Sequence, residues 1–330
     1  MNIIVDGMGG DKGIKEIVKG CVEAVNQLGI NIIIVGKRDI IEGELMKYEF
    51  PKDAIDIINA TETIFNDEEP TLAIRRKKDS SIVVGLKALT EKKGDGFVSA
   101  GSTGALLAGG LFIVKRIKGI ERAALASIYP TTKGVSFLLD MGANADCKPE
   151  YLNQFATMGS IYSEKVLEVK TPKVALVNIG TEEGKGNNLV KQSYDLIKES
   201  NINFIGNIEA RDIPRGIADV IVCDGFVGNI ILKLTEGMAI SLFTSLKEEF
   251  TKTLKSKVGA LMLKSQLKSF KGKLDYREYG GAPLLGIKQP VIKAHGSSDA
   301  FAIKNAIRQA KTFIEMDVIN IIENDINISK

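Results

Sequence analysis

The sequence predicts an α/β fold in which helices cover both faces of a largely parallel sheet. A short β-branched apolar run, a turn rich in Gly and Asp, and a helical pattern recur along the chain. Repeated strand, loop and helix imply right-handed crossovers, which place successive strands parallel to one another. The apolar runs do not alternate with polar residues, as expected for a sheet that is buried on both faces.

The recurring units follow one another in chain order. Each begins with β-branched residues, which favour strands, and continues into Gly and Asp, which favour turns. The units lie at residues 2–13, 30–39, 96–110, 135–150, 173–188 and 218–234. No repeat of fixed period and no Pro/Ser-rich linker divides the chain, so we expect one α/β domain over residues 1–330, with room for two lobes.

Residues 97–114 form an uncharged run that is long enough to span a bilayer. The run contains Gly101, Gly104, Gly109 and Gly110, and only its first four residues have the character of a strand. Glycine clusters interrupt helices, so we expect a strand and a loop here and not a membrane helix. The N-terminal residues lack the basic and apolar regions of a signal peptide, so we expect a cytoplasmic protein.

The composition is close to that of an average soluble protein, with 44% hydrophobic and 26% charged residues among 330. The three cysteines are widely spaced and form neither a disulfide framework nor a CxxC site. Because His295 is the single histidine, we expect no zinc or other metal site. We also expect no cofactor and no nucleic-acid partner.

The turn at residues 99–104, with the sequence SAGSTG, is a candidate anion site. A turn that opens a helix presents free backbone N–H groups and the positive end of the helix dipole, so phosphate is a natural ligand. Ser102 and Thr103 add hydroxyl donors. The alternative is a tight strand-to-helix turn that binds nothing, since glycine turns also occur for backbone reasons alone.

The named nucleotide-binding motifs do not fit this chain. After the first strand, Lys12 stands where the third glycine of G-x-G-x-x-G belongs. The loop at residues 180–187 contains Gly-Lys but lacks the spacer and the Ser/Thr of a P-loop. Lys185 in this loop either contacts an anion or is an ordinary solvated lysine.

Hydrolysis is the main alternative activity. The sequence AGSTG around Ser102 approximates a G-x-S-x-G nucleophile elbow, and Ser102, Asp224 and His295 follow the order of an α/β-hydrolase triad. Against this, Ala100 replaces the first glycine and no HGGG-type oxyanion element is present.

A set of motifs covers nearly the whole chain in one order. They are DGMGGD (6–11), RRKKDSSIVVGLKAL (75–89), SAGSTGA (99–105), DMGAN (140–144), KGN (185–187), IEARDI (208–213), DGFVGN (224–229), EYGGAPLLG (278–286) and AHGSSD (294–299). In these motifs the chain resembles the PlsX family of acyl-acyl carrier protein:phosphate acyltransferases. EYGGAPLLG and AHGSSD together are highly specific.

The resemblance implies that inorganic phosphate attacks the thioester of a fatty acyl-acyl carrier protein, giving acyl phosphate for phospholipid synthesis. It also implies a three-layer α/β/α sandwich like that of isocitrate and isopropylmalate dehydrogenases, in a homodimer. Phosphate is already largely a dianion near neutral pH and a thiolate leaves readily. Positioning and electrostatic stabilisation can therefore supply most of the catalysis, with no triad and no metal.

By matching motifs, Lys185 and Asn229 are expected to lie closest to the chemistry. Lys185 would neutralise phosphate or the developing oxyanion and Asn229 would donate a hydrogen bond, or the two roles would be exchanged. A structural alternative for His295 is a hydrogen bond at a helix start, given the capping preference of the adjacent serines. The residues expected to line the pocket are Asp6, Gly9, Gly10, Ser102, Thr103, Gly104, Asn144, Asp224, His295, Ser297 and Ser298.

A basic amphipathic helical excursion is expected at residues 246–275. Within it, residues 250–274 contain seven lysines and no acidic residue, so this segment carries a charge of +7. Because the net charge of the whole chain is +3, the remainder of the chain carries −4. Apolar residues recur at helical spacing in two stripes whose phase shifts around Gly259, which predicts two short helices in a projecting hairpin. The residues expected to contact a membrane or the carrier are Leu254, Lys255, Val258, Leu261 and Lys264.

Three interpretations of this excursion remain open. Its apolar stripes could pack into the core or a dimer interface, its lysines could dock the acidic carrier protein, or it could lie on anionic lipid. The family resemblance favours attachment to the inner face of the cell membrane.

Overall fold

The computed structural model describes residues 1–273, 278 and 280–328. These residues contain an eleven-stranded sheet in the order β3-β2-β1-β4-β11-β10-β5-β6-β9-β7-β8. The strands are β1 (Asn2–Asp6), β2 (Asn31–Gly36), β3 (Ile55–Asn59), β4 (Gly96–Ser99), β5 (Ala124–Thr131), β6 (Gly134–Leu139), β7 (Val174–Asn178), β8 (Phe204–Glu209), β9 (Val220–Val222), β10 (Ala282–Leu285) and β11 (Val291–Lys293). The expected α/β fold with a mostly parallel sheet is confirmed.

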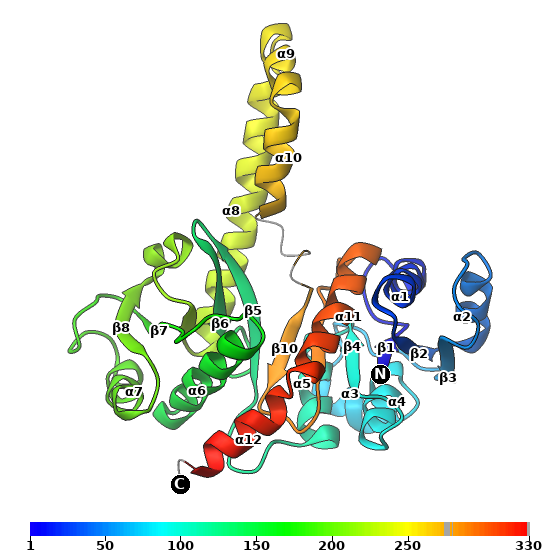
Figure 1. The fold of residues 1–330 in the computed structure, drawn as a ribbon, viewed down its shortest axis with the longest axis horizontal. Coiled ribbons are helices and arrows are strands. Elements are labelled where there is room, and N and C mark those ends of the chain that lie inside the picture. Colours follow the sequence, from blue (N-terminus) through cyan, green and yellow to red (C-terminus); the bar gives the residue numbers. More distant parts are fainter. Residues whose placement is uncertain (274–277, 279, 329–330) are drawn as a thin grey trace.

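Helices flank both halves of this sheet (Figure 1). They are α1 (Ile14–Leu28), α2 (Arg38–Leu45), α3 (Pro70–Arg76), α4 (Ser81–Thr90), α5 (Thr103–Gly109), the π-helical turn η1 (Gly110–Val114), α6 (Pro149–Lys165), α7 (Asn188–Glu199), the 3-10 turn η2 (Ala210–Arg215), α8 (Gly225–Thr251), α9 (Leu254–Met262), α10 (Lys264–Lys273), α11 (Ala300–Glu315) and α12 (Val318–Ile328).

The sheet consists of two parallel halves that run in opposite directions. Strands β1 to β4 and β11 are parallel, as are β6 to β9, while β10 pairs antiparallel with β11 and β5, and β5 with β6. The short β10 determines how far the two halves are displaced along the strand direction. Its Ala282 pairs with Lys293, the last residue of β11, and its Leu284 pairs with Leu125 of β5. The next residue of β5, Ala126, pairs with Leu139, the last residue of β6. The carboxyl ends of the two halves therefore meet beside β10.

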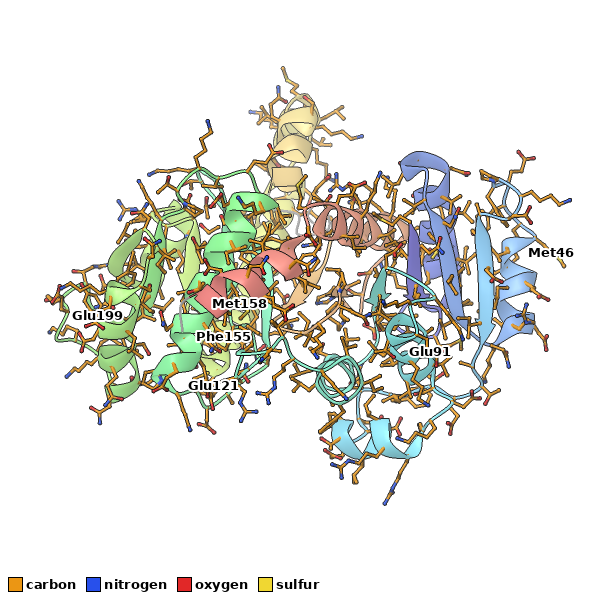
Figure 2. All side chains as sticks on the ribbon, turned by 60° about the horizontal axis from the view of Figure 1, so that its bottom comes forward. Met46, Glu91, Glu121, Phe155, Met158 and Glu199 are labelled. Atoms are coloured by element: carbon orange, nitrogen blue, oxygen red, sulfur yellow. The ribbon has the colours of Figure 1, made fainter. Side chains whose placement is uncertain are left out.

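Successive strand residues enter cores on opposite faces of the sheet. In the first half, Ile3 packs in a cluster with α1 and α11, whereas Ile4 packs in a cluster with α4 and α5. In the second half, Leu139 faces α6 and Leu138 faces η2 and α8. Both residues of each pair are fully buried, which explains why the runs are continuously apolar. Figure 2 labels Phe155 and Met158, two fully buried side chains of α6.

The halves are joined by more than β10. Helix α11 packs on the first half and α12 packs on α6 of the second, so the C-terminal helices cross between them (Figure 1). The Gln309 amide of α11 donates a 2.9 Å hydrogen bond to the buried Tyr162 hydroxyl of α6.

The uncharged run at residues 97–114 is divided between β4, α5 and η1, so the prediction that it is not one membrane helix is confirmed. A Cβ on Gly110 would lie 2.7 Å from the Leu284 side chain, so η1 packs closely against β10. By length and composition alone, α8 is the one described helix that could cross a membrane, and 11% of its apolar window is buried.

Helices α8, α9 and α10 project from the sheet body as a long arm, yellow in Figure 1. The chain turns at Thr253, which caps α9 through a reciprocal pair of hydrogen bonds with Ser256. Two short helices, α9 and α10, follow this turn, and the break between them falls at Leu263, so Gly259 lies inside α9. A helix tolerates one interior glycine at about 1 kcal/mol. Residues 274 and 275 of the expected excursion lie outside the described residues.

Candidate functional site

The Asp6 side chain forms hydrogen bonds that connect two turns at the carboxyl edge of the first half of the sheet. Asp6 is the last residue of β1, it is 1% exposed, and its carboxylate accepts hydrogen bonds from the Ser99 hydroxyl at 2.7 Å and the Met8 N–H at 3.0 Å. The Ser99 hydroxyl in turn accepts from the Gly101 N–H. A Cβ on Gly9 would lie 2.5 Å from the Gly101 nitrogen, so glycine is required where these two turns touch.

The SAGSTG turn serves as a helix cap. Ser102 is buried, and its hydroxyl accepts from the Ala105 N–H at the start of α5. Thr103 is exposed beside it. A Cβ on Gly104 would lie within 3 Å of Pro70, so part of the motif serves packing against α3.

Lys293, at the end of β11, is a residue of this edge that the sequence analysis missed. Its side chain is 8% exposed, and its ammonium group donates to the carbonyl oxygens of Ala100 and Ala294. Burial lowers the pKa of Lys293 to about 8, although the nearby Asp6 carboxylate acts in the opposite direction. The available signal was its position directly before the AHGSSD motif, at the carboxyl end of a strand.

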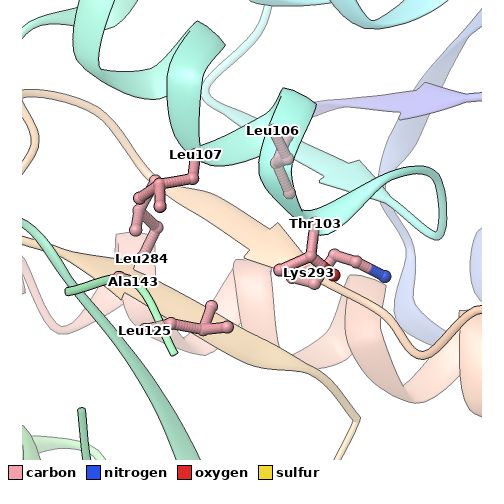
Figure 3. Close-up of a pocket in the computed structure, with 7 residues that line it drawn as sticks. All are labelled: Thr103, Leu106, Leu107, Leu125, Ala143, Leu284 and Lys293. Carbon is pink, nitrogen blue, oxygen red and sulfur yellow. The ribbon is translucent and has the colours of Figure 1, made fainter. Parts of the chain in front are cut away.

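A small apolar cavity separates the two carboxyl edges, and residues from both halves line it. Thr103, Leu106 and Leu107 come from the turn and α5, Leu125 and Ala143 from the second half, and Leu284 from β10. The aliphatic stem of Lys293 completes the wall, while its nitrogen points away from Leu107 and Leu284 (Figure 3). The SAGSTG and DMGAN turns thus face one another across β10.

His295 follows Lys293 and faces α8. Its Nδ1 accepts from the Ser297 backbone N–H at 3.1 Å and lies 2.8 Å from the Ser297 hydroxyl, while Nε2 lies 3.8 Å from a Glu236 carboxylate oxygen. Burial lowers the pKa of the imidazole, although Glu236 acts in the opposite direction. Ser298 is 5% exposed, and its hydroxyl is buried without a hydrogen-bond partner in the described part of the chain.

In the second half, Asp140 organises the DMGAN turn. The fully buried carboxylate accepts from the backbone N–H groups of Leu125, Ala143 and Asn144. Burial raises the pKa of Asp140, and these hydrogen bonds act in the opposite direction. The Asn144 side-chain amide donates to Asp140 and to the Ala123 carbonyl, both at 2.8 Å. Asn144 therefore holds the turn together.

Helix α8 begins against this turn. Its N-cap Asp224 accepts from the Val227 N–H at 2.8 Å, and a Cβ on Gly228 would overlap the Asp140 carbonyl oxygen. Asn229 is exposed on the first turns of α8 and lies against Gly142, where an added Cβ would be 3.6 Å from the Asn229 Cβ. The DMGAN and GFVGN motifs therefore form one surface.

The loop after β7 carries Lys185. The Asn178 amide donates to the Lys185 carbonyl at 3.1 Å, and the Lys185 N–H donates to the Glu182 carbonyl. Gly186 has φ +92°, and a Cβ there would overlap Asn178. The Lys185 side chain is exposed, whereas Asn187, two residues on, caps α7. This loop and the start of α8 border a cavity of about 380 Å³.

The expected site residues thus form two groups. Asp6, Gly9, Gly10, Ser102, Thr103, Gly104, His295, Ser297 and Ser298 lie at the edge of the first half, and Asn144, Lys185, Asp224 and Asn229 lie at the edge of the second. The small cavity and the approach of His295 to Glu236 of α8 connect the groups.

The bonding of the three hydrolase candidates does not resemble a triad. Ser102 and Asp224 each cap a helix through a backbone N–H, and the Nδ1 of His295, which a triad would direct at a carboxylate, bonds to Ser297.

Comparisons with known proteins identify the family. The family described as "Fatty acid synthesis protein" matches residues 1–321. A "Phosphate acyltransferase" of Alkaliphilus oremlandii is 59% identical over 327 residues, covering 99% of this chain and 98% of the relative. A "Phosphate acyltransferase" of Clostridioides difficile is 53% identical over 320 residues, covering 97% and 94% of the two chains.

Solved structures share the fold at low identity. A phosphotransacetylase from Streptococcus pyogenes has a TM-score of 0.65 and 20% identity, covering 96% of this chain and 94% of its own. A 4-hydroxythreonine-4-phosphate dehydrogenase from Klebsiella pneumoniae has a TM-score of 0.53 and 13% identity, covering 95% and 99%.

Proposed function

The chain belongs to the fatty acid synthesis protein family and transfers an acyl group to phosphate, and we propose that its acyl donor is a fatty acyl thioester of acyl carrier protein. The observation that carries the proposal is that both carboxyl edges meet beside β10, with Asn229 against Gly142 of the DMGAN turn and the exposed Lys185 in the loop after β7 of the same half. In α/β sheets, ligands bind outside the carboxyl ends of the strands.

The reaction needs a place for phosphate and a place for the oxyanion that forms when a phosphate oxygen attacks the thioester carbonyl. The carbonyl carbon bonds to phosphate, the tetrahedral oxyanion collapses, and the carrier leaves as its thiolate. In our proposal Lys185 supplies positive charge to phosphate or the oxyanion and Asn229 supplies an amide donor. Donors that lie in place before the reaction stabilise the developing charge without reorganisation.

The edge of the first half forms the opposite wall of the proposed site. Asp6 and Ser99 fix the SAGSTG turn, and the Lys293 ammonium adds buried positive charge near its backbone carbonyls. The lowered pKa of His295 favours the neutral imidazole near pH 7. In that form Nδ1 accepts from Ser297 and Nε2 carries the proton, so His295 is an N–H donor on the side of α8.

The donor is tested by supplying acyl-acyl carrier protein or acyl-coenzyme A with phosphate and trapping acyl phosphate as its hydroxamate. We expect the carrier thioester to be the better substrate in kcat/KM. Equal use of both thioesters would contradict the carrier proposal without affecting acyl transfer to phosphate. A fluorophosphonate probe that labelled Ser102 and abolished turnover would instead favour the hydrolase alternative.

The isocitrate dehydrogenase-like designation also belongs to this proposal. Its support is the arrangement of two parallel half-sheets with helices on both faces. We propose further that the chain acts as a homodimer, because α8 exposes an apolar stripe at four-residue spacing. The stripe consists of Phe226, Ile230, Leu234, Met238 and Leu242.

The tip of the arm is proposed to bind anionic membrane at the inner face of the cell. Leu254, Val258 and Leu261 are 82%, 59% and 69% exposed, and α9 buries no residue. Lys255 and Lys264 are exposed beside them. Exposed apolar side chains among lysines suit a lipid surface, where each lysine contributes roughly 1 kcal/mol. Docking of the acidic carrier at the same lysines is the alternative.

A further inference from the structure

The cavity of about 380 Å³ in the second half has a predominantly apolar wall. Leu152 of α6, Leu176 of β7, Val190 of α7 and Val227 of α8 contribute to this wall, so the cavity lies between the sheet and three helices. Its volume falls within the range of about 300–1,000 Å³ that is typical of small-molecule sites. Phosphate alone would not fill this space, and the lining residues include no lysine or arginine to pair with it.

The polar side chains that line the cavity form hydrogen bonds with the backbone. Asn178 bonds to the loop that carries Lys185, while Asn187 and Asp224 cap α7 and α8. Cys223 also lines the cavity, and burial raises the pKa of its thiol, so it stays uncharged and contributes apolar surface.

The rim lies next to the proposed reacting groups. Gly186 and Asn187 of the lining directly follow Lys185, and Val227 lies two residues before Asn229 on α8. Ile179, another lining residue at the end of β7, is 80% exposed and leaves an apolar side chain at the entrance. An apolar chain that enters past Ile179 would leave its polar end beside Lys185.

We propose that this cavity binds the hydrocarbon chain of the acyl group and that its depth limits the chain length of the substrate. The proposal rests on the placement of the reaction at Lys185 and Asn229. It assigns the cavity to a fatty acyl chain because the lining is predominantly apolar, with Asn178, Asn187 and Asp224 as its polar residues, which suits a linear hydrocarbon with a polar terminus.

The first test is Val190→Phe, assayed by kcat/KM over carrier thioesters with 8 to 18 carbons, a range we choose for the test. Each methylene that loses its apolar site costs about fourfold in kcat/KM, so exclusion of two or three methylenes lowers the value for long chains roughly 15- to 60-fold. The shortest chains keep the wild-type value. Ile205→Phe, on β8 outside the cavity and 39% exposed, is the matched control and should leave the profile unchanged.

An equal reduction for every chain length in a folded Val190→Phe variant would overturn the proposal. If this variant does not fold, the Val190→Ala variant and photolabelling of the wild type test the cavity assignment. A terminal diazirine on a long acyl donor should label Leu152 or Val190 in the wild type, and Val190→Ala should extend the preferred length. Labels confined to the arm or to the first half would overturn the cavity assignment, whereas absence of acyl phosphate with every wild-type donor would contradict the proposed function.

Discussion

Lys293 is buried at the carboxyl edge of the first half-sheet, and burial of its positive charge opposes folding. Below a pH near 8 the amine is charged in both the folded and the unfolded protein, so the cost of burying the charge is fully present. As the pH rises towards 10.5, the folded protein loses its proton first and this cost disappears.

We therefore expect Lys293→Met to gain stability relative to the wild type at pH 7, with an upper bound of roughly 3 kcal/mol. The lost hydrogen bonds to two carbonyls reduce this gain. The difference in unfolding free energy, measured by urea titration, should shrink steadily from pH 8 to pH 10. A difference that is constant over this range would show that Lys293 is not buried as a cation.

Lys185 and Asn229 carry the proposed chemistry and are both exposed on loop or helix-start positions. We expect Lys185→Ala and Asn229→Ala each to lower kcat about 10²–10³-fold, the typical cost of one lost transition-state donor. Thermal unfolding should be unchanged because neither side chain is part of a core. Lys191→Ala, an exposed lysine on α7, is the matched control. Folded variants with near wild-type turnover would refute the site assignment.

Sequence motifs predicted that several residues belong to the site, but only the structure shows which contacts these residues make. Asn144 was expected to line the pocket, yet its amide bonds to Asp140 and Ala123. Gly104 fits the anion turn by type and is required for packing against Pro70. A motif identifies which residues belong to a site, whereas hydrogen-bond partners that are distant in sequence decide what each one does.

The arm of α8, α9 and α10 is the element that we expect to bind the membrane. Leu254→Glu or Val258→Glu places a negative charge on the exposed tip, where no core packing opposes it. We expect vesicle flotation with anionic lipid to fall for both variants and to be salt-sensitive in the wild type, with activity in solution largely kept.

The control for the arm is Met46→Glu. Met46 is 85% exposed and lies near the end of α2, far from the arm (Figure 2). Equal flotation of wild type and both tip variants would contradict membrane insertion. Loss of carrier binding with normal flotation would favour the carrier-docking alternative.

For the whole molecule, the units of strand, turn and helix were predictable because each unit is local in sequence. The reversal between the two half-sheets was not, because it depends on β10, which joins β11 to β5 across more than 150 residues of chain. The SAGSTG and DMGAN turns face one another across the small cavity because of that reversal. Lys293 was missed for a related reason, since one of its two hydrogen-bond acceptors, the Ala100 carbonyl, lies 193 residues away in the sequence.

The assembly can be tested through the α8 stripe. Leu234 is 64% exposed at its centre, and a second copy of the chain would bury it. We expect the wild type to be a dimer by light scattering and Leu234→Glu to shift it towards monomer, with Met46→Glu as control. A monomeric wild type, or a fully dimeric Leu234→Glu, would contradict a dimer through α8.

In the proposed reaction, phosphate itself attacks the carrier thioester at this site. A single-turnover reaction that measures released carrier thiol and trapped acyl hydroxamate, with and without phosphate, tests this step. We expect thiol and acyl phosphate to appear in equal amounts only when phosphate is present, and Lys185→Ala to slow the appearance of both. Thiol release without phosphate, accompanied by free fatty acid, would contradict the proposed reaction.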